Sequence, residues 1–214
     1  MDKKVMADMF KYICDHDEIR PVMNGIHFDE EKKCCYGSDG HVLVLYKETI
    51  PALKGKTISE SGDEIEGRYP NVFSVFPEEK PGSFTEVAID VEQLQKACQW
   101  HSRNIDSDDK DVVVINDIGF NIKSLCGLLI TIQAVEFQPK LKFSMFGKTR
   151  PVLIHSKKMD SIIMPALYEE EKVDLKRDCG CSMIYSYENF INDYVFNSWK
   201  TVDKKKPLDW LDQY

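Results

Sequence analysis

The residues of this chain that could carry out chemistry are seven cysteines, five histidines and two Gly-Lys-Thr triplets. A phosphate-binding loop needs a further glycine five positions before the glycine of its Gly-Lys pair. That position holds Ile50 for the triplet that begins at Gly55, and Lys142 for the triplet that begins at Gly147. Neither triplet therefore predicts a nucleotide-binding site.

The cysteines could instead bind a metal ion. Cys179 and Cys181 could combine with Cys34 and Cys35 as four thiolate ligands for zinc. However, the paired spacing with two intervening residues that such sites use is absent. The seven cysteines are an odd number scattered through apolar segments, as in proteins that keep their thiols reduced. We therefore predict no metal, no cofactor and no disulfide framework.

Nucleophilic catalysis would need a cysteine or serine beside a histidine that a carboxylate orients. The five histidines form no recognisable constellation of this kind: His16, His27, His41, His101 and His155. We therefore expect no catalytic residues and a protein that is not an enzyme. An enzyme that uses a Cys and His pair is left as an alternative.

The composition sets limits on the class of protein. With 214 residues, 43% of them hydrophobic, the chain can form one ordinary domain or two small ones, which excludes a multi-module machine. Its net charge of -8 argues against a uniformly basic nucleic-acid binder but leaves room for a local basic patch. The longest charge-free run, Ser124 to Val135, is too short for a membrane span and predicts a buried helix. The N-terminus lacks a secretory pattern, so we expect a cytoplasmic protein without membrane contact.

These residues must be positioned by helices and strands that the hydrophobic spacing predicts. Apolar residues three and four apart predict helices over about 3–15, from 91 to 101, from 125 to 132 and, in the tail, from 187 to 199. Asp90 is suited to cap the second of these. Short apolar runs and alternating apolar residues predict strands at 22–28, 33–36, 42–46, 87–89, 112–115, 118–122, 141–145, 151–155 and 162–164. A helix followed by several strands occurs more than once, which favours an α+β fold.

Four segments, in this order along the chain, resemble the bacterial sliding clamp, the beta subunit of DNA polymerase III. The first is RPVMNGIHFDEEKKCCYGSDGHVLVLYK at 20–47, whose Ser-Asp-Gly-His turn is similar to the family's Thr-Asp-Gly-His turn. The others are EGRYPNVFSVFP at 66–77, GFNIKSLCGLLITIQ at 119–133 and VLIHSKKMDSIIMPAL at 152–167. Each motif alone is short, so their order carries the resemblance.

The resemblance implies a DNA-clamp-like α+β fold, with helices packed on antiparallel sheets and incomplete relative to the three-domain clamp. On this basis residues 1–80 form a truncated counterpart of the central clamp domain, and residues 84–167 a counterpart of the last domain. Residues 168–214 form a C-terminal extension. In the family the helices line a ring around duplex DNA, and the clamp tethers a polymerase without making or breaking a bond.

The resemblance also implies a pocket that takes a short hydrophobic peptide of DNA polymerase or another clamp-binding protein. Aliphatic and methionine side chains suit such an adaptable groove, and Gly40 permits close backbone approach. Val42 and Ser74 stand where the family carries arginine, so we expect a rim with less positive charge. The pocket residues implied by the resemblance are Met23, Ser38, Gly40, His41, Leu43, Pro70, Val75, Ile162, Met164 and Pro165.

Contact with duplex DNA is expected from basic residues on or beside the helices, which could bind phosphates without reading sequence. These candidates are Lys3, Lys4, Lys11, Arg20, Lys96, Arg103 and Lys123. The resemblance thus implies a sliding-clamp-like processivity protein of DNA replication, either as a homo-oligomer or as a monomer. The alternative is a clamp-derived protein-binding adaptor that does not encircle DNA. A further hypothesis is that Leu208 and Trp210 dock the tail in the pocket.

Overall fold

The computed structural model describes residues 3–16, 18–104, 110–136, 139–174 and 183–204, with side chains as far as residue 196. A large antiparallel sheet of eight strands runs in the order β4-β1-β2-β3-β10-β9-β8-β5. Its strands are β1 Ile26–Asp29, β2 Cys34–Ser38, β3 Val42–Tyr46, β4 Thr57–Ile58, β5 Thr85–Val87, β8 Lys142–Met145, β9 Val152–His155 and β10 Met159–Ile163. A second sheet has the order β11-β6-β7 and consists of β6 Val112–Ile115, β7 Ile118–Asn121 and β11 Ile184–Ser186.

The two halves of the chain share the large sheet. β3 from the first half pairs with β10 from the second, with Leu43 opposite Ile162 and Val44 opposite Ser161. Side chains alternate between the two faces of a strand. Val44 therefore points to the core beneath the helices, whereas Leu43 and Ile162 point to the opposite face. This pairing brings residues that lie about 120 positions apart in the sequence to one surface.

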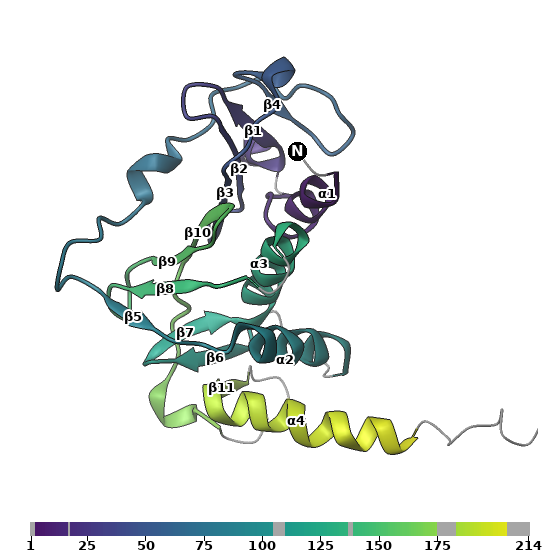
Figure 1. Ribbon diagram of the computed structural model, residues 1–214, viewed down its shortest axis with the longest axis vertical. Coiled ribbons are helices and arrows are strands. Elements are labelled where there is room, and N and C mark those ends of the chain that lie inside the picture. The colour runs from purple at the N-terminus through teal and green to yellow at the C-terminus, as the bar shows by residue number, and fades with distance from the viewer. Residues whose placement is uncertain (1–2, 17, 105–109, 137–138, 175–182, 205–214) are drawn as a thin grey trace, which may run out of the picture.

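Four helices lie along one side of the sheets, in the order α1, α3, α2, α4 in Figure 1. They are α1 Lys3–Tyr12, α2 Val91–Asn104, α3 Ile122–Val135 and α4 Tyr187–Lys204. α3 lies between α1 and α2 and is buried over most of its length. Gly127 lets α1 approach closely, because a Cβ at this position would lie only 2.9 Å from the Tyr12 Cβ. Four single-turn 3-10 helices complete the fold: η1 Pro21–Asn24, η2 Pro51–Leu53, η3 Val72–Val75 and η4 Glu170–Lys172.

The apolar residues form two cores. The larger one lies between the helices and the sheets and contains Phe28, Leu94, Leu128 and Phe143. The smaller one lies on the other face of the large sheet, where the segment 69–84 crosses the strands. It is built from Met23, Cys34, Tyr36, Leu43, Tyr69, Val72, Phe146, Leu153 and Ile162.

Most predicted elements are confirmed, including the α+β class with helices packed on antiparallel sheets. The Asp90 carboxylate accepts a hydrogen bond from the Gln93 N–H at 2.9 Å, which confirms the predicted start of α2. The charge-free run is the buried helix α3. None of the helices in the described ranges has the length and hydropathy needed to cross a bilayer.

The structure corrects the predicted elements in three places. The first helix ends at Tyr12 rather than near residue 15. Val22 was expected in a strand, but Pro21 starts a 3-10 turn there, since proline presets the backbone angle of a first helical residue. The tail was expected to add a helix alone, whereas it also adds β11 to the small sheet.

Candidate functional site

A cavity of about 230 Å³ opens on the face of the large sheet that is turned away from the helices; we refer to it as the apolar cavity. Its floor is formed by Leu43 and Ile162, which lie opposite each other on β3 and β10. η1 contributes Met23, the segment before η3 contributes Tyr69, and η3 itself contributes Val72. The cavity therefore lies where the two halves of the chain meet.

Nine of the ten residues expected to bind a partner peptide line the apolar cavity, although they come from four separate segments. They are Met23, Ser38, Gly40, His41, Leu43, Pro70, Val75, Ile162 and Met164. The tenth, Pro165, lines a neighbouring cavity instead. Among these residues, Val75 and Met164 carry exposed apolar surface, with 52% and 38% of their area accessible. The rim of the cavity is thus open to a ligand.

Hydrogen bonds fix the shape of the turn that leads from β2 to β3. The Asp39 carboxylate accepts from the N–H groups of His41 at 2.7 Å and Val42 at 2.6 Å. The Ser38 hydroxyl donates to the Val42 carbonyl at 2.7 Å and accepts from the Gly40 N–H at 3.0 Å. Gly40 has a φ of +91°, which favours glycine. The Ser-Asp-Gly-His motif thus presents His41 at the cavity edge.

Arg20 lies on the wall of the apolar cavity, although the sequence placed it among the DNA-binding candidates. Its guanidinium donates to the Asp15 carboxylate at 3.0 Å and to the Asp39 carbonyl at 3.4 Å. These contacts hold a positive charge beside Gly40. The rim was expected to have lost positive charge at Val42 and Ser74, and Arg20 supplies one from a third position.

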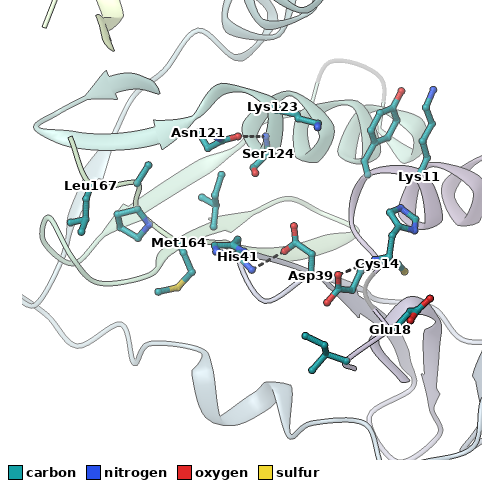
Figure 2. Close-up of a pocket in the computed structure, with 17 residues that line it drawn as sticks. Lys11, Cys14, Glu18, Asp39, His41, Asn121, Lys123, Ser124, Met164 and Leu167 are labelled. Carbon is teal, nitrogen blue, oxygen red and sulfur yellow. Dashed lines mark hydrogen bonds between the residues drawn. The ribbon is translucent and has the colours of Figure 1, made fainter. Parts of the chain in front are cut away.

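A second, wider cavity of about 1170 Å³ adjoins the first and shares His41 and Met164 with it; we refer to it as the open cavity. Figure 2 shows Lys11 and Lys123 on the helix side of the open cavity, and His41 with Met164 on the strand side. Exposed Leu167 lies at one end. No sequence pattern predicts this cavity, because residues of helices and of segments next to strands form it together.

The other six DNA-binding candidates are exposed residues of the three helices α1, α2 and α3. Lys96 pairs with Glu92 one turn earlier at 2.5 Å, and the Lys11 ammonium lies 4.9 Å from the centre of the Tyr12 ring. Together α1, α2 and α3 carry six basic but only two acidic side chains, Asp8 and Glu92. This excess is opposite in sign to the net charge of the chain.

The described cysteines are buried, which disfavours thiolate chemistry. Burial raises the pKa of the Cys14 thiol to about 12, with further increases from Asp39 and Asp15. Burial likewise raises the pKa of Cys34 to about 11. Within the described residues, no group of three His, Cys, Asp or Glu side chains is arranged to hold a metal ion. Cys179 and Cys181 lie outside the described residues.

At the level of sequence, neither a family model nor a curated protein matches this chain. Solved structures do match. The chain is similar to the sliding clamp (DNA polymerase III subunit beta) from Bartonella birtlesii bound to griselimycin, with 15% identity and a TM-score of 0.57, over 77% of this chain and 63% of that chain. It is similar to the DNA polymerase sliding clamp from Bacillus subtilis, with 17% identity and a TM-score of 0.55, over 78% and 62%.

The DNA polymerase sliding clamp from Pseudomonas aeruginosa, solved with a ligand, gives a TM-score of 0.60 at 13% identity, over 77% of this chain and 63% of that chain. The chain therefore spans less than two thirds of the length of these clamps. The likenesses confirm the fold that the four sequence motifs predict. By its large sheet, which the two halves of the chain share, and its row of helices, this chain has the fold of the bacterial DNA polymerase III beta sliding clamp.

Proposed function

We propose that this protein is a clamp-like binding protein without a catalytic centre, which takes a short hydrophobic peptide of a partner into the apolar cavity. The observation that carries the proposal is the convergence of nine of the ten expected residues on one cavity of about 230 Å³. These residues come from four segments between Met23 and Met164, so closeness in sequence does not explain their convergence.

The chemistry of the cavity suits an apolar anchor. Leu43 and Ile162 form a rigid floor on paired strands, whereas Met23 and Met164 are flexible enough to adapt to different side chains. Moving a leucine or phenylalanine side chain from water into such a site contributes about 1.5–3 kcal/mol. The rest of an extended peptide would cross His41 and Met164 into the open cavity, whose charged walls suit polar residues.

The matched structures are named as subunits or sliding clamps of a DNA polymerase. By this likeness we assign the partner to the same class: DNA polymerase or another clamp-binding protein. The protein would then act in the cytoplasm as an accessory factor of DNA replication. Within the described residues, burial and raised thiol pKa values argue against Cys14 and Cys34 as catalytic nucleophiles.

The test is the affinity of a fluorescein-labelled clamp-binding peptide, measured by anisotropy against a scrambled peptide. Val75→Asp places a charge on the rim of the apolar cavity, and we expect binding to weaken about tenfold or more, because an apolar anchor would have to desolvate that charge. Val195→Asp is the matched control, since this valine is exposed on α4. Equal affinities for the two variants would contradict the proposal.

Contact with duplex DNA is a second proposal, supported by the excess of basic residues on α1, α2 and α3. It competes with the adaptor alternative, in which the peptide cavity works without DNA. Native mass together with retention on circular and on linear DNA separates the two. A closed assembly would be retained on circular DNA and slide off linear DNA, whereas an adaptor would be retained on neither.

A further inference from the structure

The strand β6 is flanked on both sides within the chain. β7 pairs with it in antiparallel fashion on one side, and β11 pairs with it in parallel on the other, with Ile184 opposite Val112 and Tyr185 opposite Val113. Without β11, four β-branched residues would form an edge whose N–H and C=O groups face outward. Such edges readily pair with a strand of another chain.

The helix α4 directly follows β11. It lies beside α2 in Figure 1. Its residues Phe190 and Ile191 are buried, with 3% and 7% of their surface exposed. The His101 ring of α2 lies edge-on to the Tyr185 ring at 5.5 Å and is tilted against the Phe190 ring at 5.7 Å. β11 and α4 therefore bury one flank of α2 as well as the edge of β6.

A buried carboxylate connects the residue before β11 to the rest of the protein. Asp111 is 1% exposed, and its carboxylate accepts from the Met183 N–H at 2.7 Å. Its second oxygen lies 3.5 Å from Nε2 of the equally buried His101. The Val112 N–H in turn donates to the Met183 carbonyl at 2.9 Å. Met183 is thus held through both of its backbone groups.

The outer edge of β11 is also closed. Because backbone groups alternate along a strand, Ile184 and Ser186 direct theirs away from β6. The Asp174 N–H donates to the Ile184 carbonyl at 2.7 Å, and the Ser186 N–H donates to the Asp174 carboxylate at 2.8 Å. Asp174 adopts a φ of +61°, which aspartate tolerates better than most residues. Adding β11 to the sheet therefore covers the edge of β6 without leaving the outer edge of β11 open.

We propose that β11 and α4 form an intramolecular cap that prevents a second copy of this chain from pairing with the β6 edge. A second copy is the partner to expect because it brings an identical edge, and two identical edges can pair antiparallel about a two-fold axis. The apolar flank of α2 would be buried in the same contact. This inference is independent of peptide binding, because the cap and the apolar cavity share no residue.

The test compares the full-length protein with Phe190→Asp, which places a charge against His101 and releases the cap. Hydrogen exchange monitors the amides of β6, and sedimentation measures mass as a function of concentration. We expect fast exchange of β6 in the dilute variant, then dimers at higher concentration in which β6 is protected again. Phe196→Asp is the matched control, because Phe196 is 62% exposed on the same helix, and it should behave like the wild type.

A second variant tests the proposal in case Phe190→Asp does not fold. Asp174→Ala leaves the buried core intact but removes the carboxylate that accepts from Ser186, so it should loosen β11 and increase association through the β6 edge. The proposal is overturned if Phe190→Asp exposes β6 to exchange and yet has the mass of the wild type at every concentration. It is also overturned if exchange at β6 is unchanged in Phe190→Asp, or if Asp174→Ala associates no more than the wild type.

Discussion

The Met164 N–H donates a hydrogen bond to the His41 carbonyl at 2.8 Å, and both residues line both cavities. His41 is the last residue of the β2–β3 turn in the first half of the chain, whereas Met164 directly follows β10 in the second half. This bond closes the pairing of β3 with β10 at the cavity edge. The candidate binding site thus depends on both halves being docked.

Gly40→Ala should lower both stability and peptide affinity. The φ of +91° is strained for any residue with a Cβ, and the new Cβ would lie 3.1 Å from Nη1 of Arg20. We expect a loss of about 1–3 kcal/mol in the free energy of unfolding, measured by urea denaturation. Gly55→Ala is the control, since its φ is +71° but nothing lies within 4 Å of the added Cβ. It should lose stability and keep its affinity for the peptide.

Asp39→Ala should disorder the turn, because the carboxylate accepts from the N–H groups of both His41 and Val42. A cost of about 1–3 kcal/mol in the free energy of unfolding is expected for leaving these groups without their partner. Asp39→Asn keeps an acceptor oxygen and should retain most of the stability. If the two variants melt at the same temperature, the hydrogen bonds do not hold the turn.

Glu79 should make stability depend on pH. A hydrogen bond from Ser144 lowers the pKa of Glu79, and a further hydrogen bond and the charge of His155 lower it more. A carboxyl whose pKa is lowered on folding stabilises the protein above its unfolded pKa and loses this contribution as the pH falls. The advantage of the wild type over Glu79→Gln in free energy of unfolding should therefore shrink from pH 6 to pH 3.5. An advantage that is constant over this range would show that Glu79 is not involved.

Cys14 should be unreactive although it lines the open cavity, because burial raises the pKa of its thiol to about 12. Mass spectrometry of peptides after iodoacetamide treatment at pH 8 should find Cys14 unmodified in the native protein and modified in urea. Rapid labelling of native Cys14 would instead favour the alternative of an enzyme that uses a Cys and His pair.

DNA affinity should decrease with salt if the helices contact phosphates. Replacing Lys3, Lys11 and Arg103 by glutamine should reduce the slope of log K against log salt by about 0.9 for each lost phosphate contact. The control replaces Lys32, Lys54 and Lys56, which lie outside the helices, and changes the net charge equally. An equal fall in affinity for both variants would indicate a general charge effect and remove the helix-face proposal.

Sequence patterns predicted the elements whose signals are local. The spacing of Leu125, Leu128 and Ile132 predicted the buried face of α3, and Asp90 predicted the start of α2. The resemblance to the sliding clamp family predicted most residues of the apolar cavity. This was possible because the Ser-Asp-Gly-His turn and the end of β10 have local sequences similar to those of the family.

The remaining features depend on contacts between distant segments. β11 has only three residues, and its partner β6 lies about 70 positions earlier. No local hydrophobic pattern therefore predicts this pairing. Arg20 lies on the cavity wall because Asp15 and the Asp39 carbonyl hold it there. The open cavity exists only because α1, α3 and the segment after β10 come together.

The most direct test of the peptide site uses the methionine methyl groups, observed by NMR in protein labelled with ¹³C at these methyls. Met23 and Met164 line the apolar cavity, whereas Met9 and Met159 are fully buried in the core beneath the helices. On titration with a clamp-binding peptide, we predict large shifts for Met23 and Met164 and little change for Met9 and Met159. Binding that leaves the signals of Met23 and Met164 unmoved would contradict the proposed site.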